Sequence, residues 1–552
     1  MARNNESMTC KPIPMSNPTH PENEPVLGYA PGSPEREKLQ TELNNQMNSV
    51  IEIPCIINGE EIFTGNTVTQ VIPHNHGHVL ANVHLAGKAE MEAACIAAVD
   101  AQKEWINMGL EARCAIFEKC ADMLAGEWRM KINAATMLNQ SKTCFQAEID
   151  SACELIDFWR FNSHYAREFH DYLQPLVSPK GVKNTTEIRP LEGFVLAITP
   201  FNFSSIAANL PSAPALVGCT AVWKPSRNSY YSNYLLMELM MEAGLPSGVI
   251  NFVPGSGAEI TDVALANPDF AGVHFTGSTA VFQGLWQRIA EELPNLNGYP
   301  RIVGETGGKD FVVAHPNCDE HGLTVALIRG AFEYQGQKCS AASRAYIPSE
   351  VWSSISEKLC SEISKIKMGD ANDFSNFMTA VIDQRAFDKI TGYIDRAKDN
   401  PHCEIITGGN YDDSKGWFIE PTIIVSSNPK SESMVEEIFG PVLTVYVYDE
   451  DFEDILKLCD TSSPYALTGS IFASDEKDIE TAFNALRFTA GNFYINDKPT
   501  GAAVAQQPFG GARASGTNDK AGGPLNLLRW ISPRSVKRAI DIPQEWTYSF
   551  ME

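Results

Sequence analysis

Basic residues are scarce in this chain. Among its 552 residues, 43 are Lys or Arg and 68 are Asp or Glu, which gives a formal net charge of −25. A nucleic-acid-binding protein neutralises phosphates with a basic surface, and a protein that binds anionic lipid needs a similar one. The composition therefore argues against nucleic acid and membrane surfaces as partners, and a charge this far from zero favours solubility.

Long apolar runs are also lacking. The stretch at 194–223 has no charged residue, but Pro200, Pro211 and Pro214 interrupt it. A membrane-spanning helix needs about 20 consecutive apolar residues. We therefore interpret 194–223 as buried backbone of a globular protein, and the 43% of apolar residues is enough for sizeable cores.

Cysteines at disulfide or metal spacing are missing as well. The 13 cysteines are odd in number and no two of them form a C-x-x-C motif, which argues against a disulfide scaffold or a zinc ribbon and favours a reducing compartment. His74, His76 and His78 alternate as on one face of a strand, but no carboxylate or cysteine accompanies them at ligand spacing. We expect a surface strand there and no metal.

Short apolar runs alternate with helical stretches in the middle of the chain. The runs are 194–198, 220–223, 250–253 and 272–275, and the helical stretches are 229–243, 259–266 and 279–292. Strands that alternate with helices form a parallel sheet covered on both faces. A second alternation covers about 320–490, so the predicted fold class is α/β.

The flanking segments have other patterns. Residues 1–34 are rich in proline and predict an extended arm, after which Ser33 caps a helix that begins with Pro34. Residues 86–170 contain no proline and have a helical pattern. Residues 175–186 predict an exposed polar hairpin.

Three glycine-containing segments are candidates for ligand contact, and two of them follow predicted strands. Residues 275–279 read FTGST, and amides and a hydroxyl at a helix N-terminus either bind a phosphate or simply cap the helix. Residues 304–309 read GETGGK, which is either a site of close ligand approach or a surface turn with Glu305. Residues 255–257 begin like a dinucleotide fingerprint, but Ile260 replaces its third glycine, so a loop is favoured.

One cysteine lies in a polar setting. Residues 336–340 read GQKCS, and we expect this segment at a junction between a loop and a helix. A neighbouring cation or a helix N-terminus would lower the pKa of the Cys339 thiol and favour the nucleophilic thiolate. The alternative, an inert buried thiol, is our interpretation of the twelve other cysteines.

These segments occur together and in one order that resembles the aldehyde dehydrogenase superfamily. The matching segments are FVLAITPFNF at 194–203, WKPS at 223–226, FTGS at 275–278, GETGGK at 304–309, GQKCS at 336–340 and EIFGP at 437–441. Further segments resemble its Δ1-pyrroline-5-carboxylate dehydrogenase branch: 23–36, 491–498 (GNFYINDK) and 506–520 (QQPFGGARASGTNDK). The resemblance covers about 50 to 540.

The resemblance implies an enzyme that oxidises L-glutamate γ-semialdehyde to L-glutamate with NAD, in proline degradation. Cys339 would be the nucleophile, and Asn202 with the Cys339 amide would stabilise the oxyanion. Glu305 would activate the water that hydrolyses the thioester. The alternatives are a dehydrogenase of another ω-semialdehyde and a catalytically silent protein on this fold.

The same resemblance implies two binding sets. The NAD set is Ile198, Thr199, Pro200, Lys224, Ser226, Gly277, Ser278, Thr279, Glu437 and Phe439. The substrate set is Ser340, Gly501, Ala502, Phe203, Phe509 and Glu154. Two positions depart from the usual pattern. Ala502 stands where relatives usually carry a serine, and Arg227 stands where many NAD-preferring members are acidic, so some use of NADP+ is compatible with the sequence.

The implied architecture is an aldehyde dehydrogenase-like fold. Residues 1–50 would form an arm and helix, 51–320 a Rossmann-like NAD domain, 321–489 the catalytic α/β domain, and 490–552 a return to the NAD domain with the anchor loop and tail. A hairpin at 172–192 and the tail would form an oligomerisation flap, which implies at least a homodimer. The resemblance also implies the mitochondrial matrix, although residues 1–34 lack the features of a transit peptide and leave the cytosol open.

Overall fold

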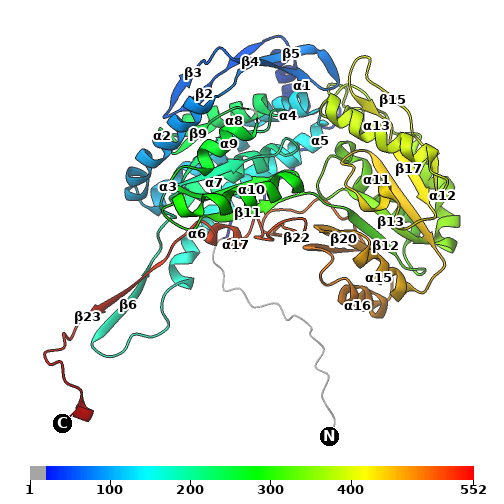
Figure 1. Cartoon of the computed structure of the whole chain (residues 1–552). Coiled ribbons are helices and arrows are strands. Elements are labelled where there is room, and N and C mark those ends of the chain that lie inside the picture. The colour runs from blue at the N-terminus through cyan, green and yellow to red at the C-terminus, as the bar shows by residue number, and fades with distance from the viewer. Residues whose placement is uncertain (1–19, 256, 552) are drawn as a thin grey trace, which may run out of the picture.

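The computed structural model describes residues 20–255 and 257–551. The part of the predicted arm at 1–19 lies outside these residues. Two large sheets, each with its own helices, form two lobes that lie side by side (Figure 1). The strands of the first sheet are, in spatial order, β11 (Arg301–Glu305), β10 (Phe270–Thr276), β7 (Phe194–Ile198), β8 (Thr220–Lys224), β9 (Ile250–Phe252), β2 (Cys55–Ile57) and β3 (Glu60–Ile62).

Both faces of the first sheet are buried. From β11 to β9 the strands are parallel, and β2 and β3 extend the sheet in the antiparallel sense. Along β7, Phe194 and Leu196 pack into one core, while Val195 and Ala197 pack into another. Because alternate side chains of a strand point to opposite faces, two separate cores require helices on both sides, which confirms the predicted doubly covered parallel sheet.

The helices of this lobe follow the predicted pattern closely. The helix expected at 229–243 is α8 (Tyr230–Ala243), and Gly244 ends it in the left-handed conformation. The stretch at 86–170 forms α2 to α6, with a π-helical turn (Glu148–Cys153) between the last two. The helices are α2 (Lys88–Asn107), α3 (Leu110–Ala125), α4 (Trp128–Gln140), α5 (Cys144–Ala147), α6 (Glu154–Tyr172), α7 (Ser204–Leu216), α8, α9 (Ala258–Leu265) and α10 (Thr279–Glu292).

The second sheet is parallel except at one edge. Its strands in spatial order are β14 (Cys403–Thr407), β17 (Thr422–Ser426), β18 (Val442–Tyr448), β13 (Ala342–Pro348), β12 (Asp310–Ala314), β20 (Thr468–Phe472) and β21 (Asn492–Ile495). Helices α11 (Glu320–Phe332) and α12 (Ser349–Ile363) contribute to the core on one face, and α15 (Phe452–Thr461) and α16 (Glu476–Ala485) to the core on the other. The remaining helices of this lobe are α13 (Gln384–Asp399) and α14 (Glu432–Val435).

The sheets divide the chain at other positions than the predicted domain boundaries. The predicted NAD domain extends to 320, yet β12 at 310–314 already belongs to the second sheet. The predicted return begins at 490, yet β21 pairs with β20 in the second sheet. The switch between lobes therefore follows Glu305, and the return follows Ile495. The residues of a connecting loop do not indicate which sheet the next strand will join. The sequence pattern therefore could not locate the two positions at which the chain passes between the lobes.

The N-terminal helix begins as predicted. Ser33 caps α1 (Pro34–Met47) by accepting a hydrogen bond from the Arg36 amide, and Leu39 and Leu43 are buried. A small sheet follows, in the order β1 (Ile51–Ile53), β5 (Asn75–His84) and β4 (Thr67–Ile72). His76 and His78 lie on β5, whereas His74 is buried in the turn before it and bonds Ser141. Within the described residues no group of three His, Cys, Asp or Glu side chains could hold a metal ion.

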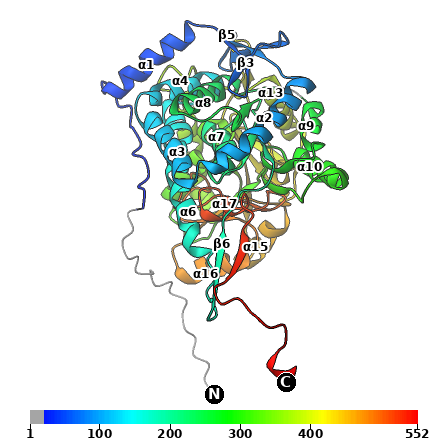
Figure 2. The same ribbon diagram turned by 90° about the vertical axis from the view of Figure 1, so that its left-hand side faces the viewer.

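A long two-stranded ribbon projects from the first lobe. It pairs β6 (Val182–Glu187) with β23 (Arg534–Ala539) in antiparallel register (Figures 1 and 2). The prediction of a local hairpin at 175–186 is therefore wrong, because β6 pairs with a strand more than 300 residues away and not with a neighbouring one. Sequence pattern detects a strand but not a distant partner. The helix α17 (Pro524–Leu528) precedes β23, and no helix in the described part of the chain could span a membrane.

Candidate active site

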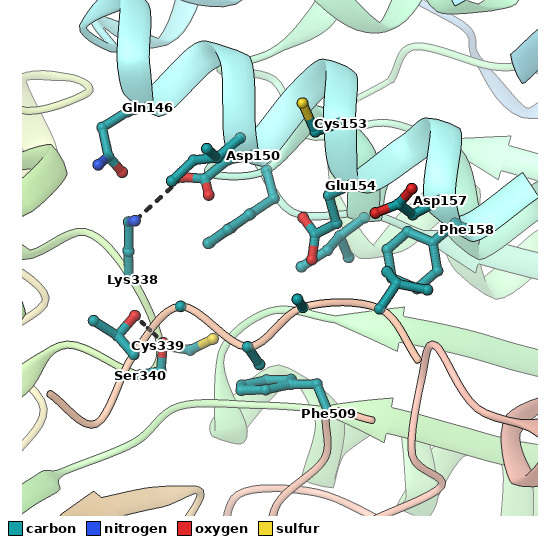
Figure 3. Close-up of a pocket in the computed structure, with 18 of the residues that line it drawn as sticks. Gln146, Asp150, Cys153, Glu154, Asp157, Phe158, Lys338, Cys339, Ser340 and Phe509 are labelled. Atoms are coloured by element: carbon teal, nitrogen blue, oxygen red, sulfur yellow. Dashed lines mark hydrogen bonds and ion pairs between the residues drawn. The ribbon is translucent and has the colours of Figure 1, made fainter. Parts of the chain in front are cut away.

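The segments that carry the predicted catalytic residues meet between the two sheets. Glu305 is the last residue of β11, and Cys339 lies in the turn that leads into β13. Both line a cavity of about 690 Å³. All six predicted substrate residues line the same cavity: Glu154, Phe203, Ser340, Gly501, Ala502 and Phe509. Figure 3 shows Asp150 and Glu154 on one helical segment, facing the loop that carries Cys339 and Ser340.

The backbone around Cys339 differs from the predicted junction between a loop and a helix. A short 3-10 turn (Glu333–Gly336) precedes the cysteine, and the strand β13 follows it. Tyr334 and Gln335 have positive φ angles of 50° and 55°, an uncommon conformation for residues with side chains. The side chain of Gln335 holds it there, because its Nε2 atom donates hydrogen bonds to Thr379 Oγ1 and to the Ala380 carbonyl.

The surroundings of the thiol also correct the expected pKa. Burial raises the pKa of Cys339 well above its ordinary value, and the carboxyl groups of Asp310, Glu305 and Glu437 raise it further. The neighbouring cation, Lys338, points its ammonium toward Asp150 at 3.3 Å and is engaged there. The thiol is therefore predominantly protonated at neutral pH in this structure, contrary to the prediction of a lowered pKa.

Two lysines share one buried carboxylate in the cavity wall. Lys142 Nζ lies 2.7 Å from Asp150 Oδ2, and Lys338 Nζ lies 3.3 Å from the same oxygen. Burial alone would raise the pKa of Asp150, but the two ammonium groups outweigh burial and hold that pKa below its ordinary value. Lys142 also lies 4.3 Å above the Phe203 ring and 4.4 Å above the Tyr334 ring.

Glu154 follows Asp150 by four residues and faces the same cavity. The Ser205 hydroxyl donates to its Oε2 atom. Burial, followed by the nearby charge of Asp150, raises the pKa of Glu154 to about 8. The π-helical turn brings Asp150 close to the start of α6, and such turns often occur at functional sites.

Glu305 is packed against glycines of the C-terminal segment. Its Oε2 atom accepts a hydrogen bond of 2.9 Å from the Gly511 amide, and a backbone bridge joins it to Gly516. Burial raises the pKa of Glu305 well above the ordinary value, which the Gly511 bond and Lys520 only partly offset. The GETGGK segment is therefore a strand end in the protein interior and not a surface turn.

The glycines of the same segment leave room for another carboxylate. A Cβ atom on Gly307 would lie 2.4 Å from Glu437 Oε2, and one on Gly308 would lie 2.3 Å from the Cys339 carbonyl. The Gly308 amide donates to Glu437 Oε1 at 2.9 Å. Lys309 is buried, and its ammonium has no hydrogen-bond partner in the described structure. The segment therefore joins the thiol loop to the loop that carries Glu437.

The predicted nucleotide residues lie at the carboxyl ends of neighbouring parallel strands. Ile198 ends β7 and is followed by Thr199 and Pro200, and Lys224 ends β8 and is followed closely by Ser226. Gly277, Ser278 and Thr279 connect β10 to α10. In sheets of this kind, ligands bind outside these strand ends. Ser278 also accepts a bond from the Val281 amide, so it caps α10 whether or not a phosphate lies there.

These residues fit a dinucleotide. Burial lowers the pKa of Lys224, and no hydrogen bond or ion pair joins its ammonium to any residue that the structure describes. Glu437, in the other lobe, presents a buried carboxylate whose pKa burial raises. An ammonium and a carboxylate are the groups that bond ribose hydroxyls. Phe439, with a positive φ of 62°, packs edge-on against Phe201 at a centroid distance of 6.0 Å.

Asn202 lies beside the thiol loop. Its Nδ2 atom donates to the carbonyl of Gln337 at 3.0 Å, two residues before the cysteine. Asn202 is not among the described residues that line the cavity. The Cys339 amide makes no hydrogen bond to another described residue. Of the two predicted oxyanion donors, Asn202 is therefore engaged with the thiol loop, and only the Cys339 backbone amide bonds no other described residue.

The anchor loop runs between β21 and β22 (Ala512–Arg513). Gly501 has a φ of 98°, a conformation that side chains disfavour. The Ser340 hydroxyl lies 2.8 Å from that of Thr500, so the loop is tied to the residue after the nucleophile. Phe509 is held by a backbone bridge to Ala521.

The sequence interpretation missed the buried pair of Lys142 and Asp150, of which Asp150 lines the cavity. Lys142 follows a stretch at 132–141 without any charge, which is a signal for a buried lysine. Asp150 and Glu154 are four residues apart, a spacing that brings two side chains to one helix face. It also missed Asn23, which lines the cavity from a segment near the N-terminus. No spacing rule connects that segment to the site.

The chain belongs to the aldehyde dehydrogenase family, whose sequence profile matches residues 63–536. It is 49% identical to the mitochondrial delta-1-pyrroline-5-carboxylate dehydrogenase of Dictyostelium discoideum over 554 residues, which is 100% of this chain and 99% of that protein. It is 46% identical to the mitochondrial Homo sapiens protein of the same name, over 96% of this chain and 94% of that one.

A solved structure shows the same fold. The Delta-pyrroline-5-carboxylate dehydrogenase of Mycobacterium tuberculosis bound with NAD superposes with a TM-score of 0.93 at 51% identity. The superposition covers 98% of this chain and all of that one. The fold expected from the sequence, an aldehyde dehydrogenase-like α/β fold with a Rossmann-like NAD domain, is thereby confirmed.

Proposed function

We propose that this protein oxidises L-glutamate γ-semialdehyde, which is in equilibrium with Δ1-pyrroline-5-carboxylate, to L-glutamate with NAD as the electron acceptor. One observation carries the proposal. A single cavity is lined by the Cys339 thiol, the Glu305 carboxylate that can act as a base, the anchor loop with Gly501 and Ala502, and the carboxyl group of Glu154. The near full-length relatives and the fold support the same reaction, and the pathway that it implies is proline degradation.

Cys339 is the nucleophile of this reaction. The S–H proton passes to solvent, the sulfur forms a bond to the aldehyde carbon, and the electron pair of the C=O double bond moves to the oxygen, which becomes an oxyanion. The donors for this oxyanion are the backbone amide of Cys339, which bonds no other described residue, and the side chain of Asn202, which bonds the Gln337 carbonyl in the thiol loop. Such preorganised donors stabilise charge as it develops in the transition state.

Glu305 prepares the water that ends the reaction. A bound NAD would supply a hydride acceptor, and loss of a hydride from the carbon of the sulfur adduct would leave a thioester. Hydrolysis then requires a base, and the Glu305 carboxylate lies in the same cavity as the thiol. It takes a proton from water while the water oxygen attacks the thioester carbon, and the Cys339 thiolate leaves. The residues that would hold the cofactor are Lys224 and Ser226 at the adenosine half, Gly277 to Thr279 at the pyrophosphate, and Glu437 with Phe439 near the nicotinamide.

The cavity matches a short amino acid. The Ser340 hydroxyl and the amides of Gly501 and Ala502 are donors for the α-carboxylate. Glu154, with a pKa raised to about 8, gains its charge fully when an ammonium group lies beside it. Phe203 and Phe509 enclose the aliphatic chain. An unsubstituted ω-semialdehyde would leave Glu154 buried without a counter-charge.

Assembly and compartment follow from two further observations. We infer that the chain forms at least a homodimer, because the segments next to the projecting β6–β23 ribbon expose large apolar side chains at Leu176, Val177 and Ile540. Light scattering of the purified protein, beside a variant that ends at residue 533, tests this inference. We also infer location in the mitochondrial matrix, since related proteins are named mitochondrial. Fractionation of cells that express the tagged chain tests the compartment.

The deciding experiment follows NADH at 340 nm with Δ1-pyrroline-5-carboxylate, succinate semialdehyde and propanal, each with NAD and NADP+. We expect NAD-dependent turnover that is far stronger with the pyrroline substrate and that is lost in Cys339→Ala. Preferred turnover of succinate semialdehyde would contradict the substrate assignment. No turnover with any aldehyde would contradict the enzymatic function.

A further inference from the structure

The segment before α1 is part of the substrate cavity. Asn23, Glu24 and Val26 line it together with Cys339 and the anchor loop. Figure 2 shows the described part of this segment running along the first lobe toward α1. In the sequence it lies far from the anchor loop that it meets. The sequence interpretation assigned no role to these residues beyond an extended arm.

Asn23 uses every polar atom of its side chain. Its Nδ2 atom donates to Asp157 Oδ2 at 2.8 Å and to the Val504 carbonyl at 2.9 Å. Its Oδ1 atom accepts from Gln506 Nε2 at 3.0 Å. Because a carboxylate only accepts hydrogen bonds, Asp157 fixes which end of the amide faces α6. The side chain therefore bridges α6 and the anchor loop.

The two bridged elements hold opposite ends of the substrate site. Asp157 lies three residues after Glu154 and on the same helix, so the two side chains lie close along α6 (Figure 3). Val504 and Gln506 follow Gly501 and Ala502 in the anchor loop. Phe158 and Val504 also share a small apolar cluster beside the bridge. The spacing between the amine end and the carboxylate end of the site therefore depends on this contact.

The arm is itself firmly held. The Glu24 amide donates to Asp157 Oδ1 at 2.7 Å, and the Glu24 carboxylate pairs with Arg129 and Arg160. Farther on, the Leu27 amide donates to Glu148 Oε1 at 2.8 Å. The arm can position the anchor loop only if the arm itself is fixed, and these hydrogen bonds and ion pairs fix it to the first lobe.

We propose that Asn23 is a positioning residue for the substrate: it holds the anchor loop at a fixed distance from α6 and so sets the length of amino acid that the cavity accepts. The inference rests on the proposed function. It assigns to the N-terminal arm a part in substrate selection, through the loop and without contact with the reacting atoms.

Steady-state kinetics of Asn23→Ala test the proposal. The KM for Δ1-pyrroline-5-carboxylate should rise about tenfold, because one net hydrogen-bonding contribution to the site geometry is lost. The KM for NAD and the kcat/KM for propanal, which has no α-carboxylate or amine, should not change. Glu22→Ala, an exposed neighbour on the arm, is the matched control and should behave as wild type.

Gln506→Ala keeps the test decisive if Asn23→Ala fails to fold. Gln506 is exposed, and its removal breaks only one of the two bonds that join Asn23 to the anchor loop, since the bond to the Val504 carbonyl remains. We expect a smaller rise in the same KM, and less than additive effects in the double variant. Equal losses with both aldehydes, or unchanged kinetics in both variants, would overturn the proposal. Wild-type protein that oxidises propanal but not the pyrroline substrate would instead refute the proposed function, and this inference with it.

Discussion

The residues on the substrate side and on the nucleotide side of Cys339 differ in how their buried charged groups are paired. On the substrate side, Asp150 is paired with both Lys142 and Lys338, so these buried charged groups have partners within the protein. On the nucleotide side, Lys224 has no hydrogen-bond partner among the described residues, and the Glu437 carboxylate bonds one backbone amide. A substrate wall with internal pairs keeps its shape alone, whereas the nucleotide side offers its charges to a ligand.

Both sides converge on Cys339, and its loss should have the largest effect. In Cys339→Ala, kcat should fall by about 10⁴-fold or more, because no other group can form the sulfur adduct. The nucleotide side should remain intact, so NAD should raise the melting temperature of the variant as much as that of wild type. Loss of that thermal shift would mean that the two sides are not separable, and residual turnover would assign the nucleophile elsewhere.

Removal of the shared carboxylate should damage folding and not only catalysis. Asp150→Ala leaves Lys142 buried without its partner, and breaking a buried pair in this way costs about 3–5 kcal/mol of unfolding free energy. Urea denaturation measures the change. The triple variant Lys142→Met/Asp150→Leu/Lys338→Met removes all three buried charges and should recover much of the loss. If Asp150→Ala is as stable as wild type, the substrate wall does not depend on this pair.

The charge around the thiol predicts an alkaline reactivity profile. The pKa of Cys339 is raised by burial and by three carboxyl groups, and only the thiolate reacts. In protein without nucleotide, the rate of inactivation by iodoacetamide should rise about tenfold per pH unit and continue past pH 8.5, where a free cysteine would level off. Peptide mapping identifies the alkylated residue. A plateau below neutrality would show a lowered pKa and favour the original sequence interpretation.

The nucleotide side should respond in affinity alone. Lys224→Met keeps the length of the side chain but removes its ammonium, so the KM for NAD should rise about tenfold with kcat unchanged. The unfolding free energy should not fall, because no protein contact of the ammonium is lost. A destabilised Lys224→Met protein would remove the contrast with Asp150→Ala. A variant with unchanged KM would remove Lys224 from the nucleotide site.

Local chemistry explains which features the sequence could predict. Strand β7 and helix α8 carry their own signals, since apolar runs and a glycine stop depend only on neighbours in the chain. The resemblance predicts the substrate residues from Glu154 to Phe509 by their order in the chain, and the structure gathers these residues in one cavity. The pKa of Cys339 could not be read in this way, because Asp310 and Glu437 reach the thiol only through the fold. The same holds for β23 as the partner of β6 and for Asn23 at the anchor loop.

The smallest expected effect concerns the departure at Ala502. This residue lines the carboxylate end of the cavity beside Gly501, and it offers only its backbone amide there. Ala502→Ser adds one hydroxyl donor, which should lower the KM for Δ1-pyrroline-5-carboxylate about threefold and leave the kinetics with propanal unchanged. A higher KM would mean that the loop is packed too closely for the extra oxygen. The position of the bound carboxylate would then depend on Ser340 and the loop amides as Asn23 holds them.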